Sequence, residues 1–196
     1  MRFGVAVLAG GCGVRMGGAK PSRLLGKASL LERSTARAFS WGAPVVLVLR
    51  SADQASLPGV RTLCDAAEVP GPLGGLRAAL CWARDSDLDA VLTIPCDMPF
   101  LPDDLPWRLA AQLTEGHAVA MAASGGRRHP ICSLWRPGVL SAIEIRAGLG
   151  RHSLHGVADH AGCVEVSWPV LAIDPFFNVN SPEDMAQAER QIAHEI

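Results

Sequence analysis

The sequence predicts an α/β fold with a mainly parallel central sheet, and two observations support this prediction. Short, fully apolar runs alternate along the chain with segments whose apolar side chains recur at helical spacing. Strands that are covered on both faces of a parallel sheet have such continuous apolar runs, whereas half-exposed strands alternate apolar and polar residues. No repeat or low-complexity linker divides the 196 residues, so we expect residues 1–196 to form a single domain.

The first half of the chain is expected to contribute strands and helices in alternation. Largely apolar runs predict buried strands at residues 3–9, 44–49 and 90–94, and we expect a short further strand at residues 60–64. Helical spacing of apolar residues predicts helices at residues 30–39 and 74–84. A glycine-rich loop follows the first strand, and Pro70-Gly71-Pro72 interrupts the chain before the second helix.

The second half continues this alternation. Pro102-Asp103-Asp104 opens a predicted helix at residues 102–115, because acidic residues in a first turn complement the helix dipole. Ser181 as N-cap and Pro182 in the first turn predict a last helix that runs to the end of the chain. Between these helices we expect strands at 117–123 and 131–135 joined by a polar, glycine-rich turn, a helix at 139–146 and a strand at 164–168.

The composition is that of a folded protein without a charged binding surface. Apolar residues make up 49% and charged residues 19%, and the formal net charge is −1. This balance argues against disorder and against nucleic-acid or membrane partners. No apolar run reaches the ~18 residues that a membrane span needs. The first apolar run leads straight into the glycine-rich loop rather than to a signal-peptide cleavage site, so we expect a cytoplasmic protein.

The six cysteines are scattered and include no C-x-x-C pair. A structural zinc site is therefore not expected. A chain of this size does not need disulfides, and we expect the cysteines to be small, free and buried side chains.

The loop after the first strand has the composition of a polyphosphate site. It runs from residue 8 to residue 20, is rich in glycine, and carries the cations Arg15 and Lys20. Glycines let backbone N–H groups approach a ligand closely, and the cations add attraction for anions. The loop is not a Walker A motif, because Lys20 is followed by Pro21, and it is not G-x-G-x-x-G. A flexible loop with two solvated cations is the alternative.

Asp97 follows a fully apolar strand and lies between Pro95 and Pro99. Proline restricts the local backbone and would hold the carboxylate in place. A carboxylate at the end of a strand, close to a triphosphate, is a natural ligand for Mg²⁺. The alternative is an aspartate that only forms a turn.

Two further loops are candidates for substrate contacts. Asp65 is followed by Pro70 and the glycine-rich residues 71–75, which could hold a base or phosphate through backbone donors, or could form a plain turn. Asn178 and Asn180 precede the last helix and could bind a polar heterocycle, or could satisfy turn backbone. The His129-Pro130 pair before a strand could touch a phosphate, although a lone histidine in a turn usually has no such role.

Taken together and in this order, these segments resemble the MobA family of molybdenum cofactor guanylyltransferases. That family has an LAGG-x-x-x-RMG-x-x-K loop, a GPL-[AG]-G segment, a CD-x-P-[FY]-[LI]-P segment, an HP pair and an F-x-N-[VI]-N-[ST]-PE segment. Here they correspond to residues 8–20, 71–75, 96–102, 129–130 and 176–183. The first loop alone is shared by many nucleotidyltransferases, whereas the ordered set is specific.

The resemblance implies a Rossmann-like nucleotidyltransferase fold. It implies transfer of GMP from GTP to molybdopterin that carries molybdenum, with Mg²⁺ as cofactor and other molybdenum-cofactor assembly proteins as partners. Catalytic roles fall to Arg15 and Lys20, which would bind and neutralise phosphate, and to Asp97, which would hold Mg²⁺. The match places Gly75, Asn178 and Asn180 on the substrate side. It implies that the nucleotide is contacted by Leu8, Ala9, Gly10, Gly11, Lys20, Asp65 and Asp97.

The sequence departs from the family pattern at three places, and two alternatives remain open. Ala19 stands where the family has Asp, Arg50 or Ser51 where it often has Asn, and residues 20–23 differ from the usual small and apolar residues. One alternative is a cytidylyltransferase that acts on molybdopterin or another phosphorylated small molecule, although Gly10-Gly11 and the intact GPL-Gly-Gly segment favour guanine. The other is a catalytically silent nucleotide-binding partner in cofactor assembly, which the loss of the acid before Lys20 would suggest.

Overall fold

The structure is a computed structural model that describes residues 1–11, 20–65, 69 and 71–194. The strands of its central sheet are β1 (Phe3–Leu8), β4 (Val45–Leu49), β5 (Arg61–Cys64), β6 (Ala90–Pro95), β7 (Val119–Ser124), β8 (Arg127–Trp135) and β9 (Cys163–Trp168). This seven-stranded sheet has the order β5-β4-β1-β6-β8-β7-β9. All neighbouring strands pair in parallel except β8, which runs antiparallel to β6 and to β7. The α/β fold with a mainly parallel sheet is therefore confirmed.

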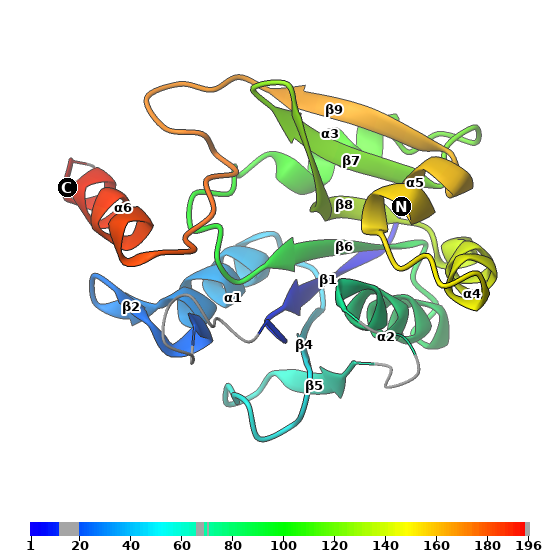
Figure 1. The fold of residues 1–196 in the computed structure, drawn as a ribbon, viewed down its shortest axis with the longest axis horizontal. Coiled ribbons are helices and arrows are strands. Elements are labelled where there is room, and N and C mark those ends of the chain that lie inside the picture. The colour runs from blue at the N-terminus through cyan, green and yellow to red at the C-terminus, as the bar shows by residue number, and fades with distance from the viewer. Residues whose placement is uncertain (12–19, 66–68, 70, 195–196) are drawn as a thin grey trace.

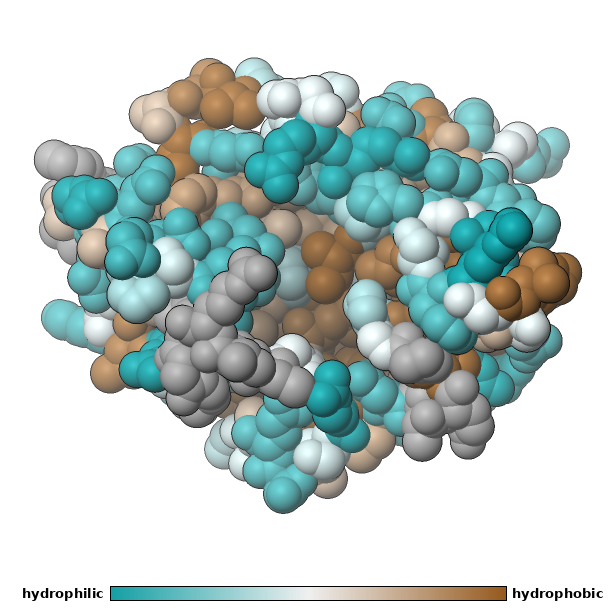
Figure 2. Space-filling model, viewed as in Figure 1, coloured by the Kyte–Doolittle hydropathy of each residue, from teal (hydrophilic) through white to brown (hydrophobic). Residues whose placement is uncertain are grey.

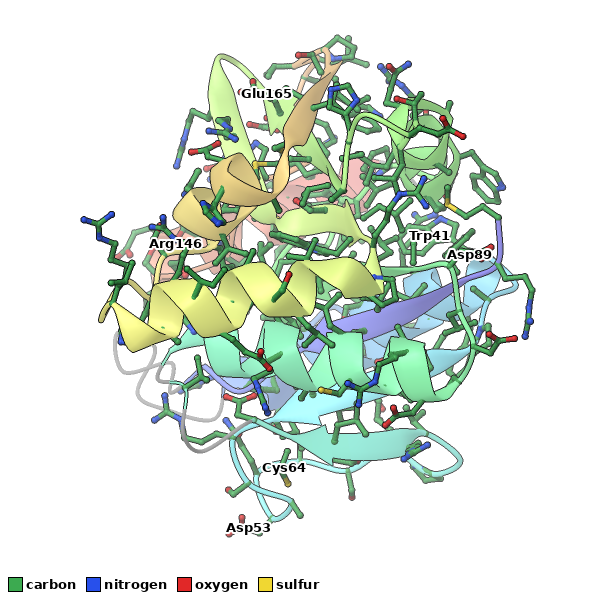
Figure 3. All side chains as sticks on the ribbon, turned by 90° about the vertical axis from the view of Figure 1, so that its right-hand side faces the viewer. Trp41, Asp53, Cys64, Asp89, Arg146 and Glu165 are labelled. Carbon is green, nitrogen blue, oxygen red and sulfur yellow. The ribbon has the colours of Figure 1, made fainter. Side chains whose placement is uncertain are left out.

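Helices cover both faces of this sheet (Figure 1). One face packs against α1 (Leu30–Ser40) and α3 (Leu105–Gln112), and the other against α2 (Pro72–Asp85), α4 (Leu140–Gly148) and α5 (Leu154–Ala161). Figure 3 looks onto the molecule from the side where α2 and α4 lie foremost. Within β1, Val5 and Val7 belong to the first core and Ala6 to the second. The continuous apolar runs are explained by this burial on both faces.

A smaller hydrophobic cluster lies apart from the two cores of the sheet. It joins the hairpin of β2 (Leu24–Leu25) and β3 (Ala28–Ser29) to the last helix, α6 (Pro182–His194), through the buried residues Leu25, Leu30, Val179 and Ala188. Ser181 caps α6 as expected, because its Oγ accepts from the N–H of Asp184 at 3.1 Å. Across the described residues, no helix combines the length and the apolar character that crossing a membrane requires.

The helix expected at residues 102–115 is shorter than predicted. Helix α3 begins at Leu105, and the two acids lie before its first turn. Asp104 accepts a hydrogen bond from the indole of Trp168 at 2.8 Å, and Asp103 forms an ion pair with Arg37. Asp104 is thus the residue that precedes the first turn of α3, and the two acids also connect this loop to β9 and to α1.

Several short elements were not expected from the sequence. The hairpin β2–β3, the helix α5 and the 3₁₀ turns at Lys20–Ser22 and Pro137–Val139 carry no clear apolar periodicity. Strand β8 begins at Arg127 rather than at residue 131, because Gly125 and Gly126 have φ of 53° and 76° and make a two-residue hairpin turn. The cysteines are free where described, but only Cys96 and Cys132 are buried, and Cys64 is exposed.

Replacing Gly4 with alanine is expected to destabilise the protein by ~1–3 kcal/mol, the usual range for overpacking a core. A Cβ atom added at Gly4 would collide with the indole ring of Trp82 and would lie 2.8 Å from Leu88 Cδ1. Urea unfolding followed by circular dichroism measures the change. Gly138→Ala is the control, because no heavy atom lies within 4 Å of its added Cβ. Equal stability of the two variants would contradict this account of the core.

Candidate active site

A pocket of ≈ 520 Å³ lies at the carboxyl ends of β1, β4, β5 and β6. This is the edge of a parallel α/β sheet where ligands bind, beside the central strand at which the chain reverses its direction of winding. Figure 2 shows a hollow near the middle of this face, with apolar residues coloured brown at its floor. The shape and place of the pocket are those of a small-molecule site.

Residues expected in the site from widely separated segments come together in this pocket. The pocket is lined by Leu8, Ala9, Gly10, Gly11, Lys20, Asp65, Gly75, Asp97, Asn178 and Asn180, among others. Arg15, for which a catalytic role was expected, and Ala19 lie outside the described residues. His129 does not line the pocket.

Lys20 joins two of these segments through its ammonium group. Lys20 lies in the 3₁₀ turn Lys20–Ser22, and its Nζ lies 2.5 Å from Asp97 Oδ2 and 2.5 Å from Asn180 Oδ1. The side chains of Lys20 and Asp97 are only 10% and 17% exposed. Ion pairs in such partly enclosed places are screened less by water and salt than those on the surface. The three side chains therefore form one hydrogen-bonded cluster at the wall of the pocket.

Two buried oxygens of residues that line the pocket lack hydrogen-bond partners among the described residues. Asp97 Oδ1 and Asn178 Oδ1 are both buried and accept no hydrogen bond from the described residues. Buried oxygen atoms of this kind usually have a partner, and here both belong to residues that line the pocket. Carboxylate and amide oxygens are hard donors suited to Mg²⁺, which takes one or two carboxylates and completes its shell with substrate phosphates and water. The donor set therefore fits such an ion.

Asp65 lies at the opposite side of the pocket, between two glycines. A Cβ atom added at Gly10 would lie 3.3 Å from Asp65 Oδ2, and one added at Gly75 would lie 3.2 Å from Asp65 Oδ1. The N–H of Asp65 donates to the carbonyl of Leu49 at 2.7 Å, which fixes its backbone to the end of β4. Burial raises the pKa of the Asp65 carboxyl, and the charge of Arg50 opposes this shift. The absence of a side chain at Gly10 and Gly75 therefore leaves the space that the Asp65 carboxylate occupies.

Helix α2 begins at the rim of the pocket. Gly71 is its N-cap with φ of 72°, a conformation that favours glycine, and no side chain caps the helix. Gly71, Pro72 and Gly75 all line the pocket. The first turn of a helix presents free N–H groups and a partial positive charge. This end of the pocket can therefore accept an anionic or hydrogen-bonding part of a ligand.

Gln54 is a contributor that the sequence did not reveal. Its Nε2 donates to the carbonyls of Ala9 and Gly11 at 3.4 and 3.5 Å, and its Oε1 accepts from the N–H of Arg50 at 3.1 Å. It thereby ties the start of the glycine-rich loop to the end of β4. Gln54 lies in an irregular loop without a recognisable motif, so no signal in the sequence distinguishes it.

Some neighbours of the predicted residues also line the pocket, among them Val48, Cys96 and Ile131. Val48 and Cys96 lie at strand ends, a position that could have identified them. Burial raises the pKa of the Cys96 thiol to about 12, and the nearby carboxylate of Asp97 adds to the shift. The thiol is therefore protonated at neutral pH, and it is a poor nucleophile.

Two solved structures have a fold similar to that of this chain. Molybdopterin-guanine dinucleotide biosynthesis protein A from Archaeoglobus fulgidus has a TM-score of 0.79 at 22% sequence identity, covering 98% of this chain and 99% of that one. The 2-C-methyl-D-erythritol 4-phosphate cytidylyltransferase from Thermus thermophilus has a TM-score of 0.69 at 20% identity, covering 98% and 100%. The fold is that of the nucleotidyltransferases.

Sequence comparison identifies the family within this class. The chain belongs to the MobA-like NTP transferase family, whose domain model matches residues 5–162. A molybdenum cofactor guanylyltransferase of Nitrobacter hamburgensis is 37% identical over 95% of this chain and 93% of its own length. That of Rhodopseudomonas palustris is 40% identical over 94% of this chain and 91% of its own length. The resemblance inferred from the motifs is therefore confirmed.

Proposed function

We propose that this protein transfers GMP from GTP to molybdopterin that carries molybdenum, with Mg²⁺ as cofactor. The observation that carries the proposal is the cluster of Lys20, Asp97 and Asn180, joined by two contacts of 2.5 Å. It unites a cation for phosphate, a carboxylate for the metal and a polar group for the acceptor at one wall of the pocket. The relatives named molybdenum cofactor guanylyltransferase, similar along nearly the whole chain, support the same assignment.

The reaction is an in-line displacement at the α-phosphorus of GTP. The phosphate of the pterin is already anionic, so its oxygen attacks without a strong general base. A bond forms between this oxygen and the α-phosphorus, the bond from the α-phosphorus to the bridging oxygen breaks, and pyrophosphate leaves with the electron pair. Lys20 would donate hydrogen bonds to phosphate oxygens and offset the charge that grows on the leaving group. We assign Arg15 the same role.

Asp97 would hold the Mg²⁺ ion, and Asn178 would contact the acceptor substrate. Both residues offer a buried oxygen that lacks a hydrogen-bond partner among the described residues. When bound, the ion would supply electrostatic stabilisation of the phosphate oxygens. The N–H of Val179 donates to the carbonyl of Asp97 at 2.9 Å, which fixes the backbone between the two asparagines beside Asp97.

Asp65 supports guanine as the base. Guanine presents two adjacent donors, N1–H and the N2 amino group, which match the paired acceptor oxygens of a carboxylate. Cytosine presents a donor beside an acceptor on its corresponding edge, and an ionised carboxylate cannot serve both. Gly10 and Gly75 leave the space that this carboxylate occupies. No feature of the described pocket favours the cytidine alternative in the same way.

Calorimetry with GTP, CTP and ATP, each with Mg²⁺, tests the proposed donor. We expect GTP to bind most tightly, and we expect pyrophosphate release only when GTP and molybdopterin are both present. A preference for CTP would overturn the guanine assignment. Nucleotide binding without any pyrophosphate release would favour the silent binding partner.

Asp65→Asn is expected to weaken GTP binding by ~10–100-fold, the range expected when hydrogen bonds to a charged group are lost. The same change should stabilise the free protein at neutral pH. Because burial raises the pKa of Asp65 above the ordinary value of 3.8, ionised Asp65 destabilises the native state, and this penalty disappears as the pH falls below the ordinary pKa. Thermal melts at neutral and acidic pH should therefore show a gain that shrinks in acid.

Asp53→Asn is the control for this prediction. Asp53 is an exposed residue on the loop between β4 and β5, and it does not line the pocket. It is labelled at the lower edge of Figure 3. Hydrogen bonds from Ser51 and from its own backbone lower the pKa of Asp53, the opposite direction from Asp65. Asp53→Asn should leave the affinity for GTP unchanged and should not stabilise the protein. A fall in melting temperature for Asp65→Asn at neutral pH would contradict the account of its burial.

A further inference from the structure

The segment from Asp174 to Asn180 brings both pocket asparagines to the site, and it is fixed from outside the pocket. We propose that His129 and Asp174 are positioning residues that hold this segment so that Asn178 and Asn180 face the acceptor substrate. The inference rests on the proposed function only for the identity of that acceptor. It also gives a role to the His129-Pro130 pair, which does not reach the pocket.

A chain of hydrogen bonds connects His129 to Asp174 through Ser124. The Nε2 of His129 lies 2.8 Å from Ser124 Oγ, and this hydroxyl lies 2.8 and 2.9 Å from the two carboxylate oxygens of Asp174. A hydroxyl has one proton, and an ionised carboxylate only accepts. The hydroxyl therefore donates to Asp174 and accepts from His129, which assigns the proton of the neutral imidazole to Nε2.

The rings of His129 and Phe176 add a second connection. They stack with their centroids 4.6 Å apart and an interplanar angle of 15°, and the ring of Trp168 meets Phe176 edge-on at 5.5 Å. Phe176 is only 2% exposed. Burial lowers the pKa of His129, with Asp174 opposing the shift and Arg127 adding to it. A neutral imidazole suits this apolar stack, because stacked and edge-on aromatic pairs attract each other beyond the effect of the area they bury.

These connections fix the backbone immediately before the asparagines. Asp174 Oδ1 accepts from the N–H of Phe176, and its carbonyl accepts from the N–H of Phe177, both at 2.9 Å. Further along, the N–H of Val179 donates to the carbonyl of Asp97 at 2.9 Å. The segment is therefore held at both ends, and Asn178 lies between the two attachments. A shift at Asp174 would move Asn178 relative to Asp97.

The position of His129 follows from an irregularity in the sheet. The register between β7 and β8 pairs Met121 with Ser133 but Ala122 with His129, so the intervening residues of β8 bulge out of the ladder. Pro130 lies within this bulge, where a residue without an N–H breaks no ladder hydrogen bond. Because of the bulge, Ile131 lines the pocket, while His129 is buried beside Ser124 and Asp174.

Hydrogen–deuterium exchange and steady-state kinetics of two variants of the full chain test the proposal. Ser124→Ala removes the central hydroxyl with little change in volume, and His129→Phe keeps an aromatic stack but removes the hydrogen bond. In both variants we expect amide exchange in residues 174–181 and the KM for molybdopterin to rise. The rise should reach ~10-fold or more in Ser124→Ala, which loses a hydrogen bond to a charged carboxylate, and should be smaller in His129→Phe, which loses a bond between neutral groups. The Kd for GTP should stay within about twofold.

Asp159→Asn is the matched control. It breaks the ion pair of 2.7 Å to Arg128, the neighbour of His129 in β8, and leaves the hydrogen bonds of the segment from Asp174 to Asn180 intact. It should leave exchange in residues 174–181 and the KM for molybdopterin unchanged. Unchanged exchange in Ser124→Ala and His129→Phe would overturn the proposal, as would an equal rise in the Kd for GTP. If the unmodified protein does not transfer GMP to molybdopterin, the proposed function fails. The exchange measurement still decides whether His129 and Asp174 hold the segment.

Discussion

Replacing Asp97 with asparagine is expected to lower the rate of pyrophosphate release by at least ~10³-fold, because the electrostatic stabilisation that a bound metal supplies is worth several kcal/mol. The carboxylate is 17% exposed and lies at the end of β6, where all six residues are buried. Asparagine has the same shape and keeps the backbone carbonyl that accepts from Val179. The variant should therefore fold normally, and it should be impaired in metal binding and in the rate of the chemical step.

The measurement for Asp97 pairs turnover with Mn²⁺ titration by electron paramagnetic resonance in the presence of GTP. Asp85→Asn is the control, since Asp85 pairs with Arg84 at the surface, where both side chains are more than half exposed. We expect the control to bind Mn²⁺ and to turn over like the unmodified protein. Near-normal turnover of Asp97→Asn would remove this residue from the metal site.

Lys20→Met is expected to weaken GTP binding by ~10–100-fold, as the loss of charge-assisted hydrogen bonds predicts. Its ammonium is the described cation that contacts both Asp97 and Asn180. Methionine fills a similar volume without charge, so the pocket should keep its shape. The effect should depend on the phosphates, and the affinity for guanosine should change much less than the affinity for GTP.

Calorimetry with GTP and guanosine measures this difference. Lys27→Met is the matched control, because Lys27 is an exposed residue between β2 and β3, a short distance along the chain. Lys20→Met also leaves a largely buried carboxylate without its partner, which destabilises a protein by ~3–5 kcal/mol in comparable cases, so its melting temperature should fall. An unchanged GTP affinity would exclude Lys20 from the phosphate site.

The sequence predicted those parts of the fold that depend on burial alone. Strand β6 and helix α2 could be predicted because their apolar residues follow the period of a buried strand or of an amphipathic helix. Helix α5 escaped prediction because its eight residues include two histidines and a glycine, and its stability comes from packing of Leu154, Val157 and Ala158. The start of α3 was placed too early because the contacts of Asp104 with Trp168 and of Asp103 with Arg37 cannot be read from the sequence.

The candidate site was predictable where it follows strand ends and unpredictable where it depends on contacts across the fold. Asp65 directly follows β5 and Asp97 lies two residues beyond the end of β6, so a parallel sheet brings them to one edge. The sequence separation of 160 residues between Lys20 and Asn180 conceals their contact. Gln54 could not be foreseen, because its role depends on where the loop after β4 meets the carbonyls of Ala9 and Gly11.

The ion pair between Lys20 and Asp97 also determines the charge of the site before substrate binds. A carboxylate so enclosed would be poorly solvated alone, and the ammonium at 2.5 Å balances its charge before any substrate arrives. In the proposed reaction, phosphate oxygens would compete with Asp97 for that ammonium, so a bound triphosphate would leave the carboxylate free for a metal ion. On the proposed function, the site would therefore bind a divalent ion mainly together with the nucleotide.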